Sequence, residues 1–181
     1  MLTDERELVM EKACCYTGHR PEKLGAGLEE GSKGLELLKQ RLFCETLRLT
    51  REGVGLFLVG MARGADLWAA EQVLSIRNVR PEGTVKLWAC IPYDRQSAAW
   101  SDKDRALYEQ ILTRADKVTH ISHEYTRACL HERNRFMVDH ATHMIAVYNG
   151  ASGGTRNTIE YARKKGLDIT VINPDELTCQ K

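Results

Sequence analysis

The sequence predicts a doubly wound, three-layer α/β domain of the Rossmann type, with about six mostly parallel strands. Short apolar runs alternate along the chain with longer segments in which apolar residues recur at helical spacing. The apolar runs are nearly continuous, which is typical of parallel strands that helices cover on both faces. The intervening segments are long enough for right-handed helical crossovers between parallel strands.

The strands are predicted where the apolar runs fall, and most of these runs end at a glycine or a proline. They lie at 12–18, 55–60, 85–92, 117–122, 143–150 and 167–174, of which 117–122 has the weakest signal. The helices are predicted where apolar side chains share one face. They lie at 32–51, 66–76, 102–114, 129–141 and 155–165. The long connection 21–33 is rich in glycine and has the length of a flap over a site.

Length and composition limit the possible classes of protein. With 181 residues, 43% of them apolar and 28% charged, the chain is predicted to form one domain over 1–181, with 1–11 as an N-terminal extension. The net charge of +1 argues against nucleic acid as a partner. No run approaches the ~20 apolar residues of a membrane span, and the acidic N-terminus is no signal peptide. We therefore expect a cytoplasmic protein without a membrane partner.

Neither the cysteines nor the histidines predict a metal site. The six cysteines include no C-x-x-C pair, and Cys14, Cys15 and Cys90 lie in strand-like runs, so we expect small buried hydrophobic residues in a reducing compartment. The pairs His120/His123 and His140/His143 lack the i, i+4 spacing of a helical zinc pair. Six histidines therefore do not change the expectation of no metal.

Ligands of open parallel sheets lie beyond the carboxyl ends of the strands, so candidate binding residues are expected in the loops that follow the strands. The first strand is followed by Thr17-Gly18-His19-Arg20-Pro21. The glycine allows a tight turn, and Thr17, His19 and Arg20 offer donors to phosphate or carboxylate oxygens. The alternative is a turn whose polar residues face water.

The second loop, after the strand at 55–60, places Gly60, Ala62 and Gly64 before a helix. It could hold an anion at the helix N-terminus, but it has neither the Walker A pattern nor G-x-G-x-x-G. Asp66 is well placed as a helix N-cap. As a ligand contact, an acid suits ribose hydroxyls better than phosphate.

The loop after the strand at 143–150 carries the most specific local signal. A strand, a turn rich in Gly, Ser and Thr and then a helix supply free N–H groups, hydroxyl donors and a favourable dipole for phosphate. The candidate residues are Ser152, Gly153, Gly154, Thr155, Asn157 and Thr158. The alternative is an ordinary glycine-rich turn. Glu160 is either a capping-box partner of Asn157 or a general acid/base that faces the ligand.

Two other segments offer candidates. Trp100 follows the third strand, with Gln96 four residues before it, and its ring either stacks on a base or belongs to the core. Arg133 and Asn134 lie in a charged run, 131–135, before the strand at 143–150. Arg133 could reach the same pocket, and the alternative is a solvated helix face.

Taken together, these motifs resemble the SLOG superfamily of Rossmann-like proteins, in particular its YpsA-like branch. The resemblance covers roughly residues 12–174. It rests on five motifs in the same order, namely Thr-Gly-His-Arg-Pro at 17–21, Gly-x-Ala-x-Gly-x-Asp-x-x-Ala-x-Glu at 60–71, Pro92 with Gln96 and Trp100, Arg-Asn-x-x-Met-Val-Asp at 133–139, and Ser-Gly-Gly-Thr-x-Asn-Thr at 152–158.

The resemblance implies a protein that binds a nucleotide or a nucleotide derivative, such as a phosphoribosyl, NAD or ADP-ribose type of ligand, with no certain cofactor. Its branch includes proteins of unassigned role, so the leading expectation is a ligand sensor that is compatible with a homodimer. The related lonely-guy phosphoribohydrolases, grouped with lysine-decarboxylase-like proteins, imply the alternative of a nucleotide N-glycosidase. Arg133 and Glu160 would then flank the glycosidic bond. The related DprA-type proteins imply single-stranded DNA binding as a weaker alternative.

Overall fold

A computed structural model describes residues 12–178 of the chain. All six strands pair in parallel in the order β4-β3-β2-β1-β5-β6. The strands are β1 (Ala13–Gly18), β2 (Leu56–Val59), β3 (Lys86–Ile91), β4 (Lys117–His120), β5 (His143–Val147) and β6 (Asp168–Ile172). The prediction of a doubly wound α/β domain with about six strands is therefore confirmed.

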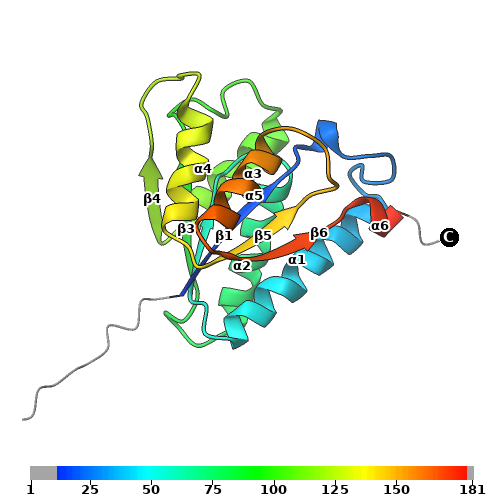
Figure 1. The fold of residues 1–181 in the computed structure, drawn as a ribbon, viewed down its shortest axis with the longest axis vertical. Helices are drawn as coiled ribbons and strands as arrows, with labels where there is room; N and C mark the ends of the chain where they lie inside the picture. Colours follow the sequence, from blue (N-terminus) through cyan, green and yellow to red (C-terminus); the bar gives the residue numbers. More distant parts are fainter. Residues whose placement is uncertain (1–11, 179–181) are drawn as a thin grey trace, which may run out of the picture.

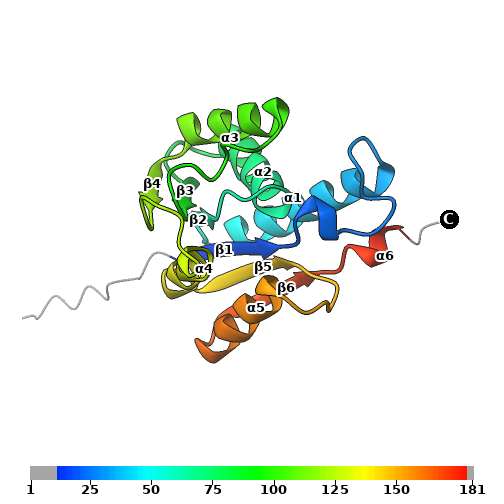
Figure 2. The same ribbon diagram turned by 90° about the horizontal axis from the view of Figure 1, so that it is seen from above.

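Helices cover both faces of this sheet. Figure 2 shows α1, α2 and α3 on one side and α4 and α5 on the other. Their bounds are α1 (Lys33–Arg51), α2 (Ala65–Val79), α3 (Asp102–Arg114), α4 (Cys129–Asp139) and α5 (Gly154–Lys164). Each predicted helix is present with small shifts of its ends. The short α6 (Asp175–Thr178) and the 3₁₀ turn η1 (Pro21–Lys23) were not predicted.

The order of the strands creates a switch point between β1 and β5. From β1 the chain proceeds through β2 and β3 to the edge strand β4, then crosses the other face through α4 and returns as β5 on the free side of β1 (Figure 1). The connections after β1 and β5 therefore leave the sheet toward opposite faces. Such a divergence opens a crevice at the carboxyl ends of the two strands.

The two faces of the central strand enter two separate hydrophobic clusters. Cys14 and Tyr16 pack on the side of α1, α2 and α3, whereas Ala13 and Cys15 pack on the side of α4 and α5. The predicted burial of Cys14, Cys15 and Cys90 is confirmed, since all three have 0% exposure. Burial raises the pKa of the Cys90 thiol to about 12, so this group stays a neutral, unreactive thiol.

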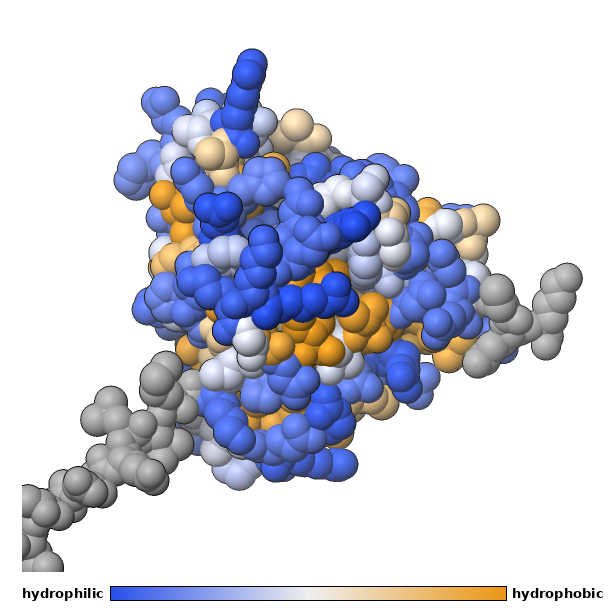
Figure 3. Space-filling model, viewed as in Figure 1, coloured by the Kyte–Doolittle hydropathy of each residue, from blue (hydrophilic) through white to orange (hydrophobic). Residues whose placement is uncertain are grey.

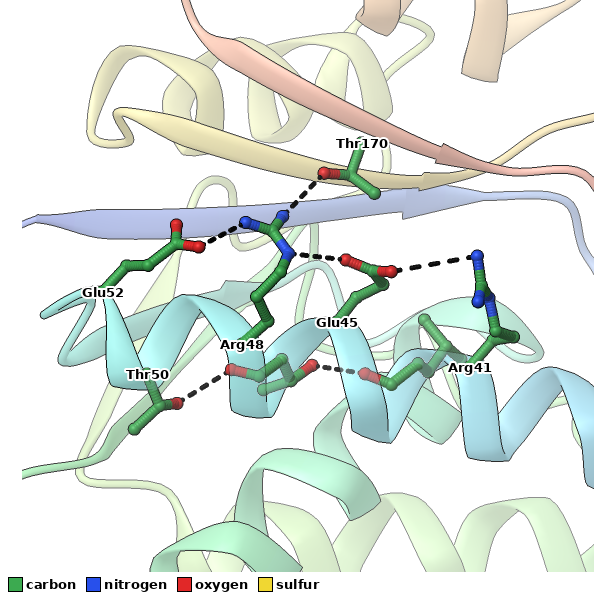
Figure 4. Close-up of polar contacts among 8 residues, drawn as sticks. Arg41, Glu45, Arg48, Thr50, Glu52 and Thr170 are labelled. Atoms are coloured by element: carbon green, nitrogen blue, oxygen red, sulfur yellow. Dashed lines mark hydrogen bonds and ion pairs between the residues drawn. The ribbon is translucent and has the colours of Figure 1, made fainter.

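The long helix α1 is tied to the edge strand β6 across the surface. Arg48 donates to Glu45 at 2.9 Å, to Glu52 at 2.8 Å and to the Thr170 hydroxyl of β6 at 3.2 Å (Figure 4). Figure 3 shows hydrophobic surface in the middle of this face, where α1 passes beneath β6 in Figure 1, with hydrophilic surface around it. No helix in the described part of the chain is long and apolar enough to cross a membrane.

Candidate functional site

A cavity of about 310 Å³ opens over the switch point. Its walls come from four segments: the end of β1 with the turn after it, the loop after β2, the first turns of α4, and the start of α5. Arg20, Lys23 and Arg133 line it with Asp66 as the one carboxylate among the described lining residues. Three cationic side chains against one carboxylate give the cavity a net positive charge and favour an anionic ligand.

The N-terminus of α5 supplies backbone donors to this cavity. Its N-cap is Gly153, with φ 141°, and no side chain caps the helix or places an acid in its first turn. The first N–H groups of an α-helix have no acceptor within the helix, so those of Gly154 and Thr155 remain for a ligand. The Lys23 ammonium lies 3.6 Å from the point that a Cβ on Gly153 would occupy. Lys23 of the 3₁₀ turn η1 therefore places a cation beside the N-terminus of α5.

Arg133 and Asp66 form a buried pair in the wall of the cavity, each with 6% exposure. Arg133 Nη1 donates to the Gly60 carbonyl and lies 3.4 Å from Asp66 Oδ2. Arg133 Nε is buried and has no hydrogen-bond partner among residues 12–178. Burial raises the pKa of Asp66, against the opposing effects of Arg133 and the Ala62 N–H, and burial lowers the pKa of Arg133. One strong donor of the guanidinium is left unused.

Gly60 is required by the close approach of this pair. A Cβ at Gly60 would overlap the Arg133 guanidinium and come within 2.7 Å of Asp66 Oδ2. The next residue, Met61, is fully buried and has φ 58°, the left-handed region that side chains rarely adopt. With this strained conformation at Met61, the flanking backbone groups face the charged pair. The Gly60 carbonyl accepts from Arg133, and the Ala62 N–H donates to Asp66 at 3.2 Å.

His19 lines the cavity and is held by the loop after β5. Its Nε2 lies 2.9 Å from Asn149 Oδ1, and its ring packs on Tyr148 with 5.6 Å between centroids. Asn149 Oδ1 also accepts from the Ala151 N–H at 3.2 Å, which identifies this atom as the acceptor. His19 therefore donates through Nε2, and its Nδ1 is an acceptor when the ring is neutral.

Asn134 connects α4 to α5 beside the cavity. Its Nδ2 donates to the Thr158 hydroxyl at 2.9 Å, and that hydroxyl donates to the Gly154 carbonyl at 2.8 Å. Thr158 is 4% exposed and its hydroxyl is used within the protein. Thr158 therefore positions Asn134 and the start of α5, and Asn134 keeps its amide oxygen for a ligand.

The cavity brings together most of the residues that the sequence singled out. They are Thr17, Gly18, His19, Arg20, Ala62, Asp66, Arg133, Asn134, Ser152, Gly153, Gly154 and Thr155. The others lie elsewhere. Gln96 and Trp100 line a neighbouring hollow of about 190 Å³, and Asn157 and Thr158 line one of about 240 Å³ between α4 and α5. Gly64 lines a hollow of about 590 Å³ together with residues of the segment 21–30. Gly60 does not line the cavity but packs against Arg133 and Asp66, which do.

Three predictions about the carboxylates of Glu160 and Asp66 do not fit the structure. Glu160 does not line the cavity, since its carboxylate accepts from Arg156 Nε at 2.9 Å on the exposed face of α5. It is no capping-box partner of Asn157 either, because the N-cap of α5 is Gly153. Asp66 is not an N-cap, because Gly64 holds that position and the Asp66 carboxylate binds the preceding loop.

Sequence reasoning missed several lining residues, above all Lys23, His131, Tyr93 and Tyr125. Lys23 reaches the cavity because η1 folds the chain back over Gly153, which no local pattern indicates. His131 lies in the same charged run as Arg133, two residues before it, and this proximity was the signal that the sequence offered. Among the described residues, no group of three or more His, Cys, Asp or Glu side chains is arranged to hold a metal ion.

A parallel, doubly wound sheet with a cationic cavity over its switch point defines a Rossmann-like α/β protein. The chain belongs to the YspA SLOG family, because the family model YpsA matches residues 14–177. It is 28% identical to the uncharacterized SPbeta prophage-derived protein YoqJ of Bacillus subtilis, over 70% of this chain and 81% of that protein. It is also 28% identical to a UPF0398 protein of Halalkalibacterium halodurans, over 92% of this chain and 90% of that one.

Solved structures with the same fold include two DNA processing proteins. The chain superposes on DprA from Streptococcus pneumoniae with a TM-score of 0.61 and 17% identity, over 90% of this chain and 50% of that one. On DprA from Helicobacter pylori, described with a single-stranded DNA binding mode, the chain superposes with a TM-score of 0.61 and 14% identity. The match covers 91% of this chain and 66% of that one. The chain therefore spans half to two thirds of the length of these proteins. Family and neighbours together support a nucleotide-binding type of fold.

Proposed function

We propose that this protein binds a phosphorylated ribosyl compound of the nucleotide class in the cavity between β1 and β5. The observation that carries the proposal is that Arg133 lines the cavity and that its buried Nε has no partner among the described residues. A buried, unpaired guanidinium nitrogen costs free energy unless a ligand accepts from it. A phosphate oxygen is the acceptor that an Arg fork and a helix N-terminus both suit.

Asp66 gives the site a second specificity. Its carboxylate is an acceptor of hydrogen bonds beside the anion-binding groups, and sugar hydroxyls are donors that fit it. Arg133 and Ala62 hold the carboxylate in place. A ligand with both a phosphate and ribose hydroxyls meets the two kinds of groups together.

The proposed activity is binding, as in a ligand sensor, rather than hydrolysis. The nucleotide N-glycosidase alternative gave Glu160 the part of assisting water, but that carboxylate lies outside the cavity and pairs with Arg156. The fold shared with DprA gives single-stranded DNA as another candidate ligand, and the net charge of +1 argues against it.

The test is calorimetric titration of the full chain with ribose 5-phosphate and with ribose. The Lys23→Gln variant removes a charge beside the α5 N-terminus, and Lys164→Gln, at the far exposed end of α5, is the matched control. Ribose 5-phosphate should bind and ribose should not. Lys23→Gln should weaken binding about tenfold, equivalent to ~1.4 kcal/mol, as expected for a charge-assisted hydrogen bond.

The Lys164→Gln variant should bind as tightly as the unaltered protein. Equal weakening by the two variants would show a diffuse charge effect and would contradict the site. Absence of binding by ribose 5-phosphate, together with a salt-steep affinity for a single-stranded oligonucleotide, would favour the DNA-binding alternative instead.

A further inference from the structure

A second hollow continues the cavity toward β3 and β4. It measures about 190 Å³ and shares Arg20, Ala62 and Leu130 with the first cavity. The first cavity, at about 310 Å³, lies at the lower end of the ~300–1,000 Å³ of small-molecule sites, so a ligand larger than a phosphosugar needs further space. The small side chain of Ala62 stands where the two spaces meet.

Aromatic rings form the walls of this second hollow. Tyr93 follows β3, Tyr125 lies in the connection before α4, and their rings meet edge to face with 5.3 Å between centroids and 79° between planes. Tyr125 is 63% exposed, although a tyrosine ring is mostly apolar. Trp100 also lines the hollow, edge to face against Tyr108 at 5.4 Å, with the Arg63 guanidinium 6.0 Å from its ring centroid.

Two polar side chains of the hollow, Gln96 and Arg63, are used for support. Gln96 Nε2 donates to the Met61 carbonyl at 3.1 Å and so holds the loop that separates the two spaces. Arg63 pairs with Glu22 and with Asp104. Arg20 lines both spaces, and its guanidinium makes no hydrogen bond or ion pair to another residue between 12 and 178. The planar guanidinium of Arg20 is thus available between the proposed phosphate-binding groups and the aromatic walls.

We propose that the second hollow binds the nucleobase of the ligand, and that the natural ligand is therefore a nucleotide with an intact base rather than a phosphosugar. This inference rests on the proposed function, which places the phosphate at the start of α5. The flat faces of tyrosine, tryptophan and arginine side chains attract aromatic rings. Stacking on such a surface accepts any of the nucleobases, because every base has a π-face. Tyr125 gains a partner for its exposed ring when the base is bound.

The experiment compares AMP with ribose 5-phosphate on the full chain by calorimetric titration. The variants are Tyr125→Ala, Tyr125→Phe and, as the matched control, Tyr161→Ala on α5, whose ring borders the separate hollow between α4 and α5. AMP should bind the unaltered protein at least tenfold more tightly than ribose 5-phosphate. Tyr125→Ala should remove most of this difference and leave the affinity for ribose 5-phosphate within twofold, whereas Tyr125→Phe should retain it.

The outcomes separate the two proposals. If ribose 5-phosphate fails to bind, the phosphate site itself is wrong. If ribose 5-phosphate binds and AMP gains nothing over it, the base subsite is wrong and the phosphate site stands. If Tyr161→Ala removes the gain in place of Tyr125→Ala, the base lies between α4 and α5. If Tyr125→Phe loses as much as Tyr125→Ala, a hydroxyl contact rather than stacking explains the gain, and the proposal is overturned.

Discussion

Replacement of Gly60 by alanine tests whether the buried Arg133–Asp66 pair determines the local structure. The added Cβ would overlap the Arg133 guanidinium, which could yield only by moving toward the cavity that Arg133 lines. The guanidinium must then leave both the Gly60 carbonyl and Asp66. Loss of one partner from a buried ion pair typically costs ~3–5 kcal/mol. We expect Gly60→Ala to lower the free energy of unfolding by about that amount.

The measurement is urea unfolding followed by the fluorescence of Trp68, Trp88 and Trp100, with thermal unfolding beside it. For a chain of this size, ~3–5 kcal/mol corresponds to a decrease of about 6–20 °C in Tm. Gly25→Ala is the matched control, because a Cβ there finds its nearest neighbour, Asp175 Oδ1, at 3.9 Å. The control should change the free energy of unfolding by less than about 0.5 kcal/mol.

A double-mutant cycle connects this loss of stability to its cause. In an Arg133→Met background the guanidinium is absent, so Gly60→Ala should cost far less than in the unaltered protein, with an interaction energy of at least ~1 kcal/mol. Additive costs would mean that the alanine acts on the backbone of the loop and not on Arg133. A Gly60→Ala variant within about 1 kcal/mol of the unaltered protein would refute the reasoning directly.

Two further predictions concern stability away from the cavity. Ser32 accepts from the Leu35 N–H at 3.1 Å as the N-cap of α1, so Ser32→Ala should cost ~1 kcal/mol in urea unfolding, whereas Ser75→Ala on the exposed side of α2 should cost less than about 0.5. The Lys165 ammonium and then the Tyr161 hydroxyl lower the pKa of Asp139. The native state therefore binds fewer protons at Asp139 than the unfolded state, and its stability advantage over Asp139→Asn should be present above about pH 4 and disappear as the pH falls below it. An advantage that persists or grows at lower pH would contradict this assignment.

The fold could be predicted from the sequence because its four inner strands, β1, β2, β3 and β5, are mostly buried on both faces. Runs such as the one that contains Cys14, Cys15 and Tyr16 allow few structures other than a central parallel strand. The ends of the elements were less accurate, since the predicted strand 143–150 ends at Val147 and the polar residues after it turn away. The start of α2 was predicted one residue late, because Asp66 suits an N-cap by type while the positive φ of Gly64 determines the cap.

The candidate site was predictable only to the level of its loops. The loops after β1, β2 and β5 meet because parallel strands place their carboxyl ends at one edge, which topology alone requires. The direction of each side chain on α5 was harder to predict. Arg156 and Glu160 have the i, i+4 spacing of an exposed ion pair, and that signal was present in the sequence. Lys23 reaches the site only because η1 lies beside the start of α5 in the folded chain. No local sequence pattern around Lys23 therefore predicts that it lines the cavity.

The presence of Asp66 in an anion site follows from the burial of Arg133. A guanidinium at 6% exposure needs a counter-charge when no ligand is bound, and Asp66 with the Gly60 carbonyl provides partners on the side of Nη1. If the pair were only structural, the buried donor Nε would also be expected to find an acceptor, as nearly all buried polar atoms do. Instead Nε is left unpaired, in a residue that lines the same cavity as Lys23 and the start of α5. Asp66 therefore keeps Arg133 in place without saturating it, and a phosphate that enters meets a cation whose position is already fixed and whose ordering costs little at the moment of binding.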